Sequence, residues 1–137
     1  MSCIELIEVN TKEDLHGSLS IIEDLKDVPF QIRRIYYIHS LKKTDTLVRG
    51  KHAHKELHQV FIAIHGEFDL TIDDGEQSAK FHLKDPTEAL YLKPGYWREL
   101  TNFSPDAVCL VLASDHYVES DYIRDYQEFI NWKKSHS

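Results

Sequence analysis

Alternating apolar residues along HQVFIAIHGEFDLTIDDGEQSAKFHL, residues 58–83, constrain the fold more than any other feature. Two sets of three apolar residues recur at every second position: Val60, Ile62 and Ile64, followed by Phe68, Leu70 and Ile72. A period of two places one face of a β-strand on a core. The breaks fall at His65-Gly66 and at Asp73-Asp74-Gly75, and Asp-Gly is a strong hairpin signal. The stretch therefore predicts three consecutive strands joined by turns.

The rest of the chain adds further short strands. The candidates are SLSIIEDL and FQIRRIYYIHS upstream, and EALYLKPGYWREL and AVCLVLAS downstream. These strands are numerous, are separated by turn residues and have no helix-length periodic segment between them. We therefore expect an all-β antiparallel sandwich or small barrel over about residues 4–115. A parallel sheet with crossover helices does not fit this pattern.

The final stretch, SDYIRDYQEFINWKK, has a different period. Ile123, Tyr126 and Ile130 recur at helical intervals, Ser or Asp can cap the amino end, and Lys133-Lys134 lies near the other end. This pattern predicts one C-terminal α-helix over about 120–134. A chain of 137 residues has the length of one ordinary domain, so we expect a single domain over 1–137.

The charge of the chain limits its partners. The net charge is −7, and the 16 Lys and Arg residues are scattered, which argues against nucleic acid and an anionic membrane as partners. An anionic small molecule remains compatible, because a pocket needs only two or three cations placed close together.

The N-terminal sequence and the cysteines indicate the compartment. MSCIELIEVNTKEDL has acidic residues where a secretory signal needs an apolar segment, and no run is long enough to cross a bilayer. We therefore expect a cytoplasmic protein. Cys3 and Cys109 lack the spacing of a zinc or redox motif, so we expect buried or idle thiols.

Three histidines lie close together in RGKHAHKELHQ, residues 49–59. His52 and His54 are two residues apart, so on a strand their side chains leave the same face. Burying these two polar side chains and the nearby Arg49 on a barrel strand would cost folding free energy unless they line a cavity. The other candidates in the central part of the chain are expected to be structural or solvent-exposed: His39, His58, His65 and His82.

The spacing of Gly50, His52, His54, position 59 and Gly66 resembles the first motif of the cupins, which are small jelly-roll barrels. PGYWRE, residues 94–99, resembles the second cupin motif. Many cupins bind a metal through the two histidines and a glutamate of the first motif and a histidine of the second.

Two of those four metal-binding positions differ in this sequence: Gln59 replaces the glutamate and Arg98 replaces the histidine. Glutamine is a weak ligand for a transition metal, and arginine is a cation that would repel one. We therefore expect no metal and no cofactor, although Glu56 and His58 could in principle complete a ligand set. Two imidazoles without a metal remain candidates for acid–base catalysis.

Beyond the cupin motifs, the chain resembles the sugar nucleotide 3,4-ketoisomerases nearly from end to end. The matching tracts are HGSLSIIE, PFQIRRIYYI, RGKHAHKELHQ, IDDG, KPGYWRELTNFS, VCLVLASDHY and DYIRDYQEF. The resemblance implies a jelly-roll fold, commonly a homodimer. It also implies a metal-free isomerisation of dTDP-4-keto-6-deoxyglucose in deoxyamino-sugar biosynthesis for surface polysaccharides such as O-antigen. By the family mechanism, we assign His54 as the base and His52 as its partner.

The chemistry of such a reaction assigns roles to nearby cations. An enediolate needs a preorganised positive charge, for which Arg49 and Arg98 are the candidates. Arg33 or Arg34 could bind the pyrophosphate, and Tyr37 would share the face of Arg33.

His16 and Arg98 occupy positions where the relatives differ, and these relatives leave either the gluco or the galacto configuration at C4. The resemblance implies that both residues line the substrate pocket. Arg98 favours the gluco product here. The alternatives left open are a dTDP-sugar 3,5-epimerase, a metal-dependent cupin oxygenase and a non-catalytic sugar-binding cupin.

Overall fold

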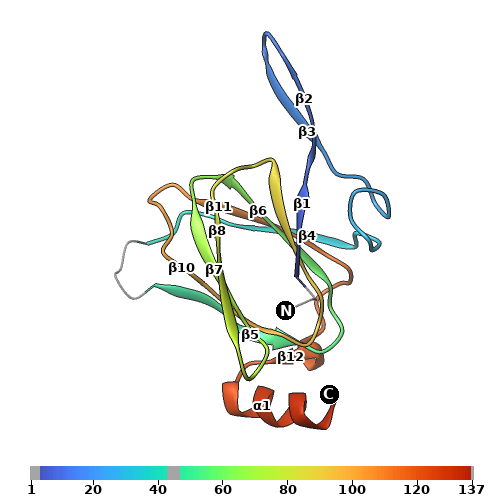
Figure 1. The fold of residues 1–137 in the computed structure, drawn as a ribbon, viewed down its shortest axis with the longest axis vertical. Helices are drawn as coiled ribbons and strands as arrows, with labels where there is room; N and C mark the ends of the chain where they lie inside the picture. The colour runs from blue at the N-terminus through green and yellow to red at the C-terminus, as the bar shows by residue number, and fades with distance from the viewer. Residues whose placement is uncertain (1–3, 43–46, 137) are drawn as a thin grey trace.

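Two five-stranded antiparallel sheets face each other in the computed structural model, which describes residues 4–42 and 47–136 (Figure 1). The first sheet has the order β1 (Ile4–Glu8), β9 (Glu88–Leu92), β6 (Gln59–His65), β11 (Val108–Ala113), β4 (Arg34–Ile38). The second has the order β12 (Tyr122–Ile123), β5 (Val48–His54), β10 (Trp97–Thr101), β7 (Phe68–Asp73), β8 (Ser78–Leu83). From β5 to β11, every connection except that between β7 and β8 crosses from one sheet to the other, as in a jelly roll. The predicted antiparallel β fold is confirmed.

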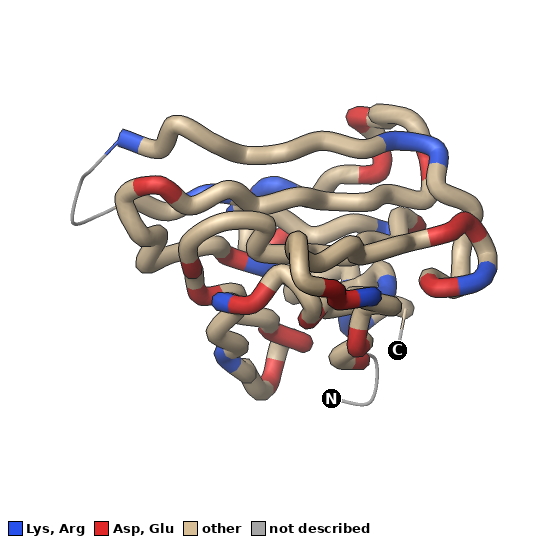
Figure 2. The backbone as a smooth tube through the Cα atoms, turned by 90° about the horizontal axis from the view of Figure 1, so that it is seen from above, with Lys and Arg blue, Asp and Glu red and all other residues tan. Residues whose placement is uncertain are grey.

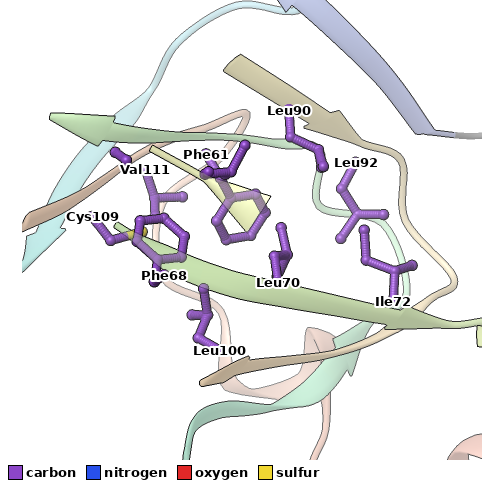
Figure 3. Close-up of a cluster of buried hydrophobic side chains, with 11 residues drawn as sticks. Phe61, Phe68, Leu70, Ile72, Leu90, Leu92, Leu100, Cys109 and Val111 are labelled. Carbon is purple, nitrogen blue, oxygen red and sulfur yellow. The ribbon is translucent and has the colours of Figure 1, made fainter. Parts of the chain in front are cut away.

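The core between the sheets contains the predicted apolar set of β7, whereas β6 contributes the residues between its predicted apolar positions (Figure 3). Phe61 and Ala63 point inward from β6, while Phe68, Leu70 and Ile72 point inward from β7. The opposite face of β6 packs Val60 and Ile62 in a second cluster, against Val28 and Phe30 of the loop before β4. The first sheet is therefore apolar on both faces, and β6 is buried on both sides over most of its length.

A two-stranded hairpin, β2 (Asn10–Asp14) and β3 (Gly17–Ile21), projects away from the two sheets (Figure 1). Leu15 at its turn is fully exposed, and Leu19 is 61% exposed. The predicted strand SLSIIEDL is thus half of this hairpin, and lies outside both five-stranded sheets.

The C-terminal helix is shorter than predicted. Helix α1 spans Tyr126–Ser135, and Asp125 caps it by accepting a hydrogen bond from the Glu128 backbone N–H. The residues before it form a 3-10 turn, Glu119–Asp121, and the strand β12. The predicted start at 120 is wrong because residues 122–123 pair with β5.

Figure 2 shows the basic residues distributed along the chain among the acidic ones. No helix in the described part of the chain is long and apolar enough to span a bilayer. Cys109 is buried, and its burial raises the pKa of the thiol to about 12. Cys3 lies outside the described residues.

Candidate active site

A cavity of about 550 Å³ lies where β4, β5 and β10 approach one another. Its lining carries an unusual share of cations: Arg34, Arg49, Lys51, Arg98 and Arg124. His52, Tyr36 and Tyr122 contribute further polar groups. An acidic protein thus gathers positive charge at one place, which suits an anionic ligand.

The two histidines of β5 contact each other at the wall of this cavity. Because they alternate on one strand, both side chains leave the same face, and their Nε2 atoms lie 3.1 Å apart. The rings meet edge to face, with centroids 4.7 Å apart. His52 lines the cavity, whereas His54 is fully buried behind it and lines a second cavity of about 240 Å³.

Burial, reinforced by the charge of Arg98, lowers the pKa of both His52 and His54 to about 2. Desolvation disfavours the charged imidazolium, and a guanidinium nearby adds repulsion. Both rings are therefore neutral near pH 7, so either one can accept a proton.

Asp121 lies directly behind His54. The Nδ1 atom of His54 is 2.8 Å from Oδ2 of Asp121. The other carboxylate oxygen accepts a hydrogen bond from the Glu56 backbone N–H at 2.7 Å, and the Asp121 carbonyl accepts one from Lys55. The pairing of β12 with β5 brings these residues together across 67 positions of sequence. No spacing or motif in the sequence signals Asp121, because its contact with His54 joins residues far apart in the chain.

Arg98 is fully buried, with a neutral acceptor as its principal partner. Its Nη1 donates to the amide oxygen of Gln59, whose Nε2 donates to the Tyr36 hydroxyl at 3.0 Å. Burial lowers the pKa of Arg98 to about 10, so the guanidinium remains charged at neutral pH. The Nε atoms of Arg98 and Arg34 are buried without a hydrogen-bond partner in the described residues. A buried N–H donor without an acceptor lowers the stability of the folded protein. These two donors therefore favour binding of a ligand rich in oxygen acceptors.

The prediction that Arg33 faces the pocket is wrong. In β4, Arg34, Tyr36 and Ile38 line the cavity, whereas the Arg33 side chain donates to Gln31 outside it. The register of β4 with β11 decides which alternate residues of β4 face the cavity. It turns Arg34, the other candidate for binding the pyrophosphate, toward the cavity. Tyr37 is 62% exposed and contributes to the cavity lining together with His39.

The segment after β11 closes one side of the cavity. Tyr122 packs against both histidines, with ring centroids 4.9 Å from His52 and 4.4 Å from His54. Arg124 lies over the Tyr122 ring at 4.1 Å and binds Glu119 through two hydrogen bonds of 2.9 Å. Tyr122 and Arg124 are further lining residues that the sequence analysis did not single out.

Two histidines lie away from the cavity: His16, which was expected to line it, and His58, which was expected to be structural or exposed. His16 is exposed at the turn of the projecting hairpin and does not contribute to the cavity lining. His58 hydrogen-bonds to the Tyr91 hydroxyl at 2.8 Å and stacks on its ring, in a different cluster from the histidine pair. Arg49 does line the cavity.

The side chains at the cupin metal positions form a different network. Gln59 and Arg98 bind each other. They therefore do not supply the carboxylate and the imidazole that complete a metal site in other cupins. Among residues 4–42 and 47–136, no three His, Cys, Asp or Glu side chains are grouped so that they could hold a metal ion.

A jelly roll with two histidines against a cation-lined cavity defines a cupin whose site suits an anionic ligand. The family model FdtA, described as WxcM-like, C-terminal, matches residues 2–134. The chain belongs to this family.

Similar proteins include sugar isomerases. The chain is 45% identical over 116 residues to TDP-4-oxo-6-deoxy-alpha-D-glucose-3,4-oxoisomerase of Aneurinibacillus thermoaerophilus, covering 85% of this chain and 82% of that protein. A 3,4-ketoisomerase structure from Helicobacter canadensis has a TM-score of 0.91 and 43% identity, covering 96% and 97% of the two chains.

A second similar structure contains a bound sugar nucleotide. It is a histidine-to-asparagine variant of the 3,4-ketoisomerase QdtA from Thermoanaerobacterium thermosaccharolyticum in complex with TDP-4-keto-6-deoxyglucose. The TM-score is 0.93 at 38% identity, with 98% of this chain and 96% of that chain covered.

Proposed function

We propose that this protein is a 3,4-ketoisomerase that converts TDP-4-keto-6-deoxyglucose into a TDP-3-keto-6-deoxyhexose. The observation that carries the proposal is the contact between two neutral histidines beside a cavity lined by arginines. The relatives that carry this activity in their names cover nearly the whole chain.

The reaction is balanced without an oxidant. The histidine pair removes the proton from C3, and the electron pair of that C–H bond enters the enediolate as the C4 carbonyl oxygen becomes anionic. The hydroxyl proton at O3 moves to O4, and the pair then delivers a proton to C4. The ketone is thereby moved from C4 to C3, and proton transfer of this kind typically contributes about 10²- to 10⁴-fold to the rate.

The cations have separate tasks in this proposal. Arg98, buried beside the pair, stabilises the enediolate oxygen, because a preorganised charge in a dry site needs no reorganisation during the reaction. Arg34 and Arg49 bind the pyrophosphate, and Tyr37 contacts the nucleotide at the edge of the cavity. The substrate would also satisfy the unpaired Nε donors of Arg98 and Arg34.

The mechanism that we propose needs no metal. Support comes from the donor set, because Gln59 and Arg98 occupy the positions of two cupin metal ligands and bind each other. Exhaustive chelation should leave the turnover number unchanged. A transition metal that copurifies with the protein, and whose removal abolishes turnover, would disprove the metal-free mechanism.

We propose that the active form is a homodimer in which the β2–β3 hairpin packs against a second copy. The hairpin exposes Leu15 and Leu19 and places His16 at its turn, away from the cavity of its own chain. Replacing both leucines, Leu15→Asp with Leu19→Asp, should yield monomers in sedimentation experiments. Leu25→Asp, a change at another exposed leucine, is the control and should leave the dimer intact.

We further propose that the enzyme works in the cytoplasm and supplies a pathway to a deoxyamino sugar. A 3-keto group is the form of the sugar that an aminotransferase converts to an amine.

Incubation with TDP-4-keto-6-deoxyglucose in D₂O, followed by NMR, tests the proposed function. We expect a 3-keto product with deuterium at C4, and the coupling of the neighbouring protons in a parallel H₂O reaction assigns the gluco or galacto configuration. Deuterium at C5 with the carbonyl still at C4 would indicate an epimerase instead. Tight binding of the nucleotide sugar without turnover would indicate a binding protein.

A further inference from the structure

The carboxylate of Asp121, which lies behind the histidine pair, has no role in the reaction as written above. We propose that Asp121 is a positioning residue that fixes the tautomer of His54 and so makes Nδ1 of His52 the atom that accepts the substrate proton. This inference rests on the proposed function, and it reverses the order of base and partner inferred from the sequence.

The tautomer of His54 follows from the chemistry of its neighbour. A carboxylate offers only acceptors, so the 2.8 Å contact with Asp121 requires a hydrogen on Nδ1 of His54. A neutral imidazole carries one N–H, so Nε2 of His54 is a bare acceptor. The 3.1 Å contact between the Nε2 atoms then requires His52 to donate its Nε2–H to His54. One carboxylate therefore sets the protonation of both rings.

In this arrangement, Nδ1 of His52 is the one ring nitrogen of the two histidines whose lone pair is free to accept a proton. Nδ1 of His52 makes no hydrogen bond within the described residues. It is also not buried, so it is accessible. His52 also lines the larger cavity. Nε2 of His54, in contrast, is already occupied by His52, and the whole side chain is buried. The substrate carbon can therefore reach His52 and not His54.

Asp121 also compensates the charge that proton transfer creates. When Nδ1 of His52 accepts the substrate proton, its Nε2–H can pass to Nε2 of His54, which becomes an imidazolium whose Nδ1–H still binds Asp121. His52 is then neutral again, and the positive charge on His54 lies against a carboxylate, which offsets the repulsion that Arg98 exerts on a proton at either ring. After exchange with solvent, the same steps in reverse deliver a proton to the neighbouring carbon of the substrate.

Replacement of Asp121 by asparagine tests the role of the carboxylate. The side-chain amide of the new asparagine can donate to Nδ1 of His54 and so favours the other tautomer. We expect Asp121→Asn to lower kcat by about 10²- to 10⁴-fold, as for a wrong tautomer behind a catalytic histidine, while KM and the affinity for TDP change by less than about threefold. Asp115→Asn is the matched control, since Asp115 lines the same second cavity without contacting His54. This control should retain the wild-type kcat.

Nitrogen-15 NMR of histidine-labelled enzyme separates positioning from a merely structural role, and it does not depend on turnover. We expect the proton of His54 on Nδ1 in the wild type and on Nε2 in Asp121→Asn, with the signal assigned by its loss in His54→Asn. The double variant Asp121→Asn/His54→Asn should lose no more kcat than His54→Asn alone, because the two residues act as a unit.

The inference is wrong if wild-type His54 carries its proton on Nε2, a result that needs no variant to fold. It is also wrong if Asp121→Asn keeps kcat within about threefold of the wild type. The same holds if the double variant loses as much kcat as the losses of Asp121→Asn and His54→Asn combined. A wild-type enzyme that does not isomerise the sugar would disprove the proposed function. In that case the NMR result would still decide the tautomer.

Discussion

Inside the barrel, the guanidinium of Arg98 donates a hydrogen bond to the amide oxygen of Gln59. These residues occupy two of the four positions that hold the metal in many cupins, and their pairing gives a buried cation a neutral partner. An arginine bound to a carboxylate would have its charge compensated before any substrate arrived. With Gln59 as its partner, Arg98 keeps a charge that is available to a developing oxyanion, at a cost to the stability of the empty protein.

Replacing both members of the pair, Arg98→Met with Gln59→Leu, should raise the free energy of unfolding by about 1–3 kcal/mol, because a desolvated charge and its partner become apolar. Turnover should fall by about 10²- to 10³-fold, because the oxyanion loses its donor. Urea unfolding at fixed protein concentration and the isomerase assay measure the two effects. Gln59→Leu alone should destabilise the protein, since it leaves Arg98 without its principal acceptor. A double variant less stable than this single one would contradict the argument.

His52→Asn and His54→Asn should each lower kcat by about 10²- to 10⁴-fold and leave TDP binding nearly unchanged. Both act on the same proton, one at the substrate and the other behind it, in contact at 3.1 Å. Calorimetry with TDP and the isomerase assay measure the two quantities. The control is His58→Asn, which alters a histidine bound to Tyr91 and should retain activity. An active His52→Asn variant would move the substrate-facing base elsewhere.

The free energy of unfolding should decrease as the pH falls below about 6.5. The pKa of His52 and His54 is about 2 in the folded protein, so between these values the unfolded chain binds more protons than the folded one. Each histidine adds a slope of up to about 1.4 kcal/mol per pH unit. Urea unfolding at several values between about pH 7.5 and about pH 5.5 should show a shallower slope for the variant His52→Asn/His54→Asn.

Gly66→Ala should lower the free energy of unfolding by about 2–4 kcal/mol. Gly66 has a φ of +68°, which favours glycine, and a Cβ there would overlap the Ser104 side chain and lie 2.8 Å from the Ala107 Cα. Gly75→Ala is the control, because Gly75 also has a positive φ but a Cβ would meet its nearest atom at 3.4 Å. Thermal or urea unfolding compares the two, and equal losses would show that backbone conformation alone, not the close contact, sets the cost.

The sequence predicted the elements whose cause is local. The apolar alternation at 60–64 and 68–72 identified β6 and β7, and the period of two placed His52 and His54 on one face of β5. These features depend only on neighbouring residues, since a strand turns its side chains to alternate faces wherever it lies.

The errors arose where distant residues decide the structure. Which of Arg33 and Arg34 faces the cavity depends on the register of β4 with β11, and FQIRRIYYIHS is polar and apolar on both faces. The helix prediction began too early because residues 122–123 pair with β5 instead of continuing a helical period. Asp121 was missed for the same reason, as only the folded barrel brings it to His54.

The contact between β12 and β5 also sets the order in which the site can assemble during translation. Strands β5, β6, β9, β10 and β11 are all synthesised before residues 119–123, so a nascent chain can form most of both sheets first. His54 meets Asp121, and Tyr122 closes over the histidines, only after that later segment has left the ribosome. The growing chain can therefore fold its barrel before it acquires a working pair of histidines.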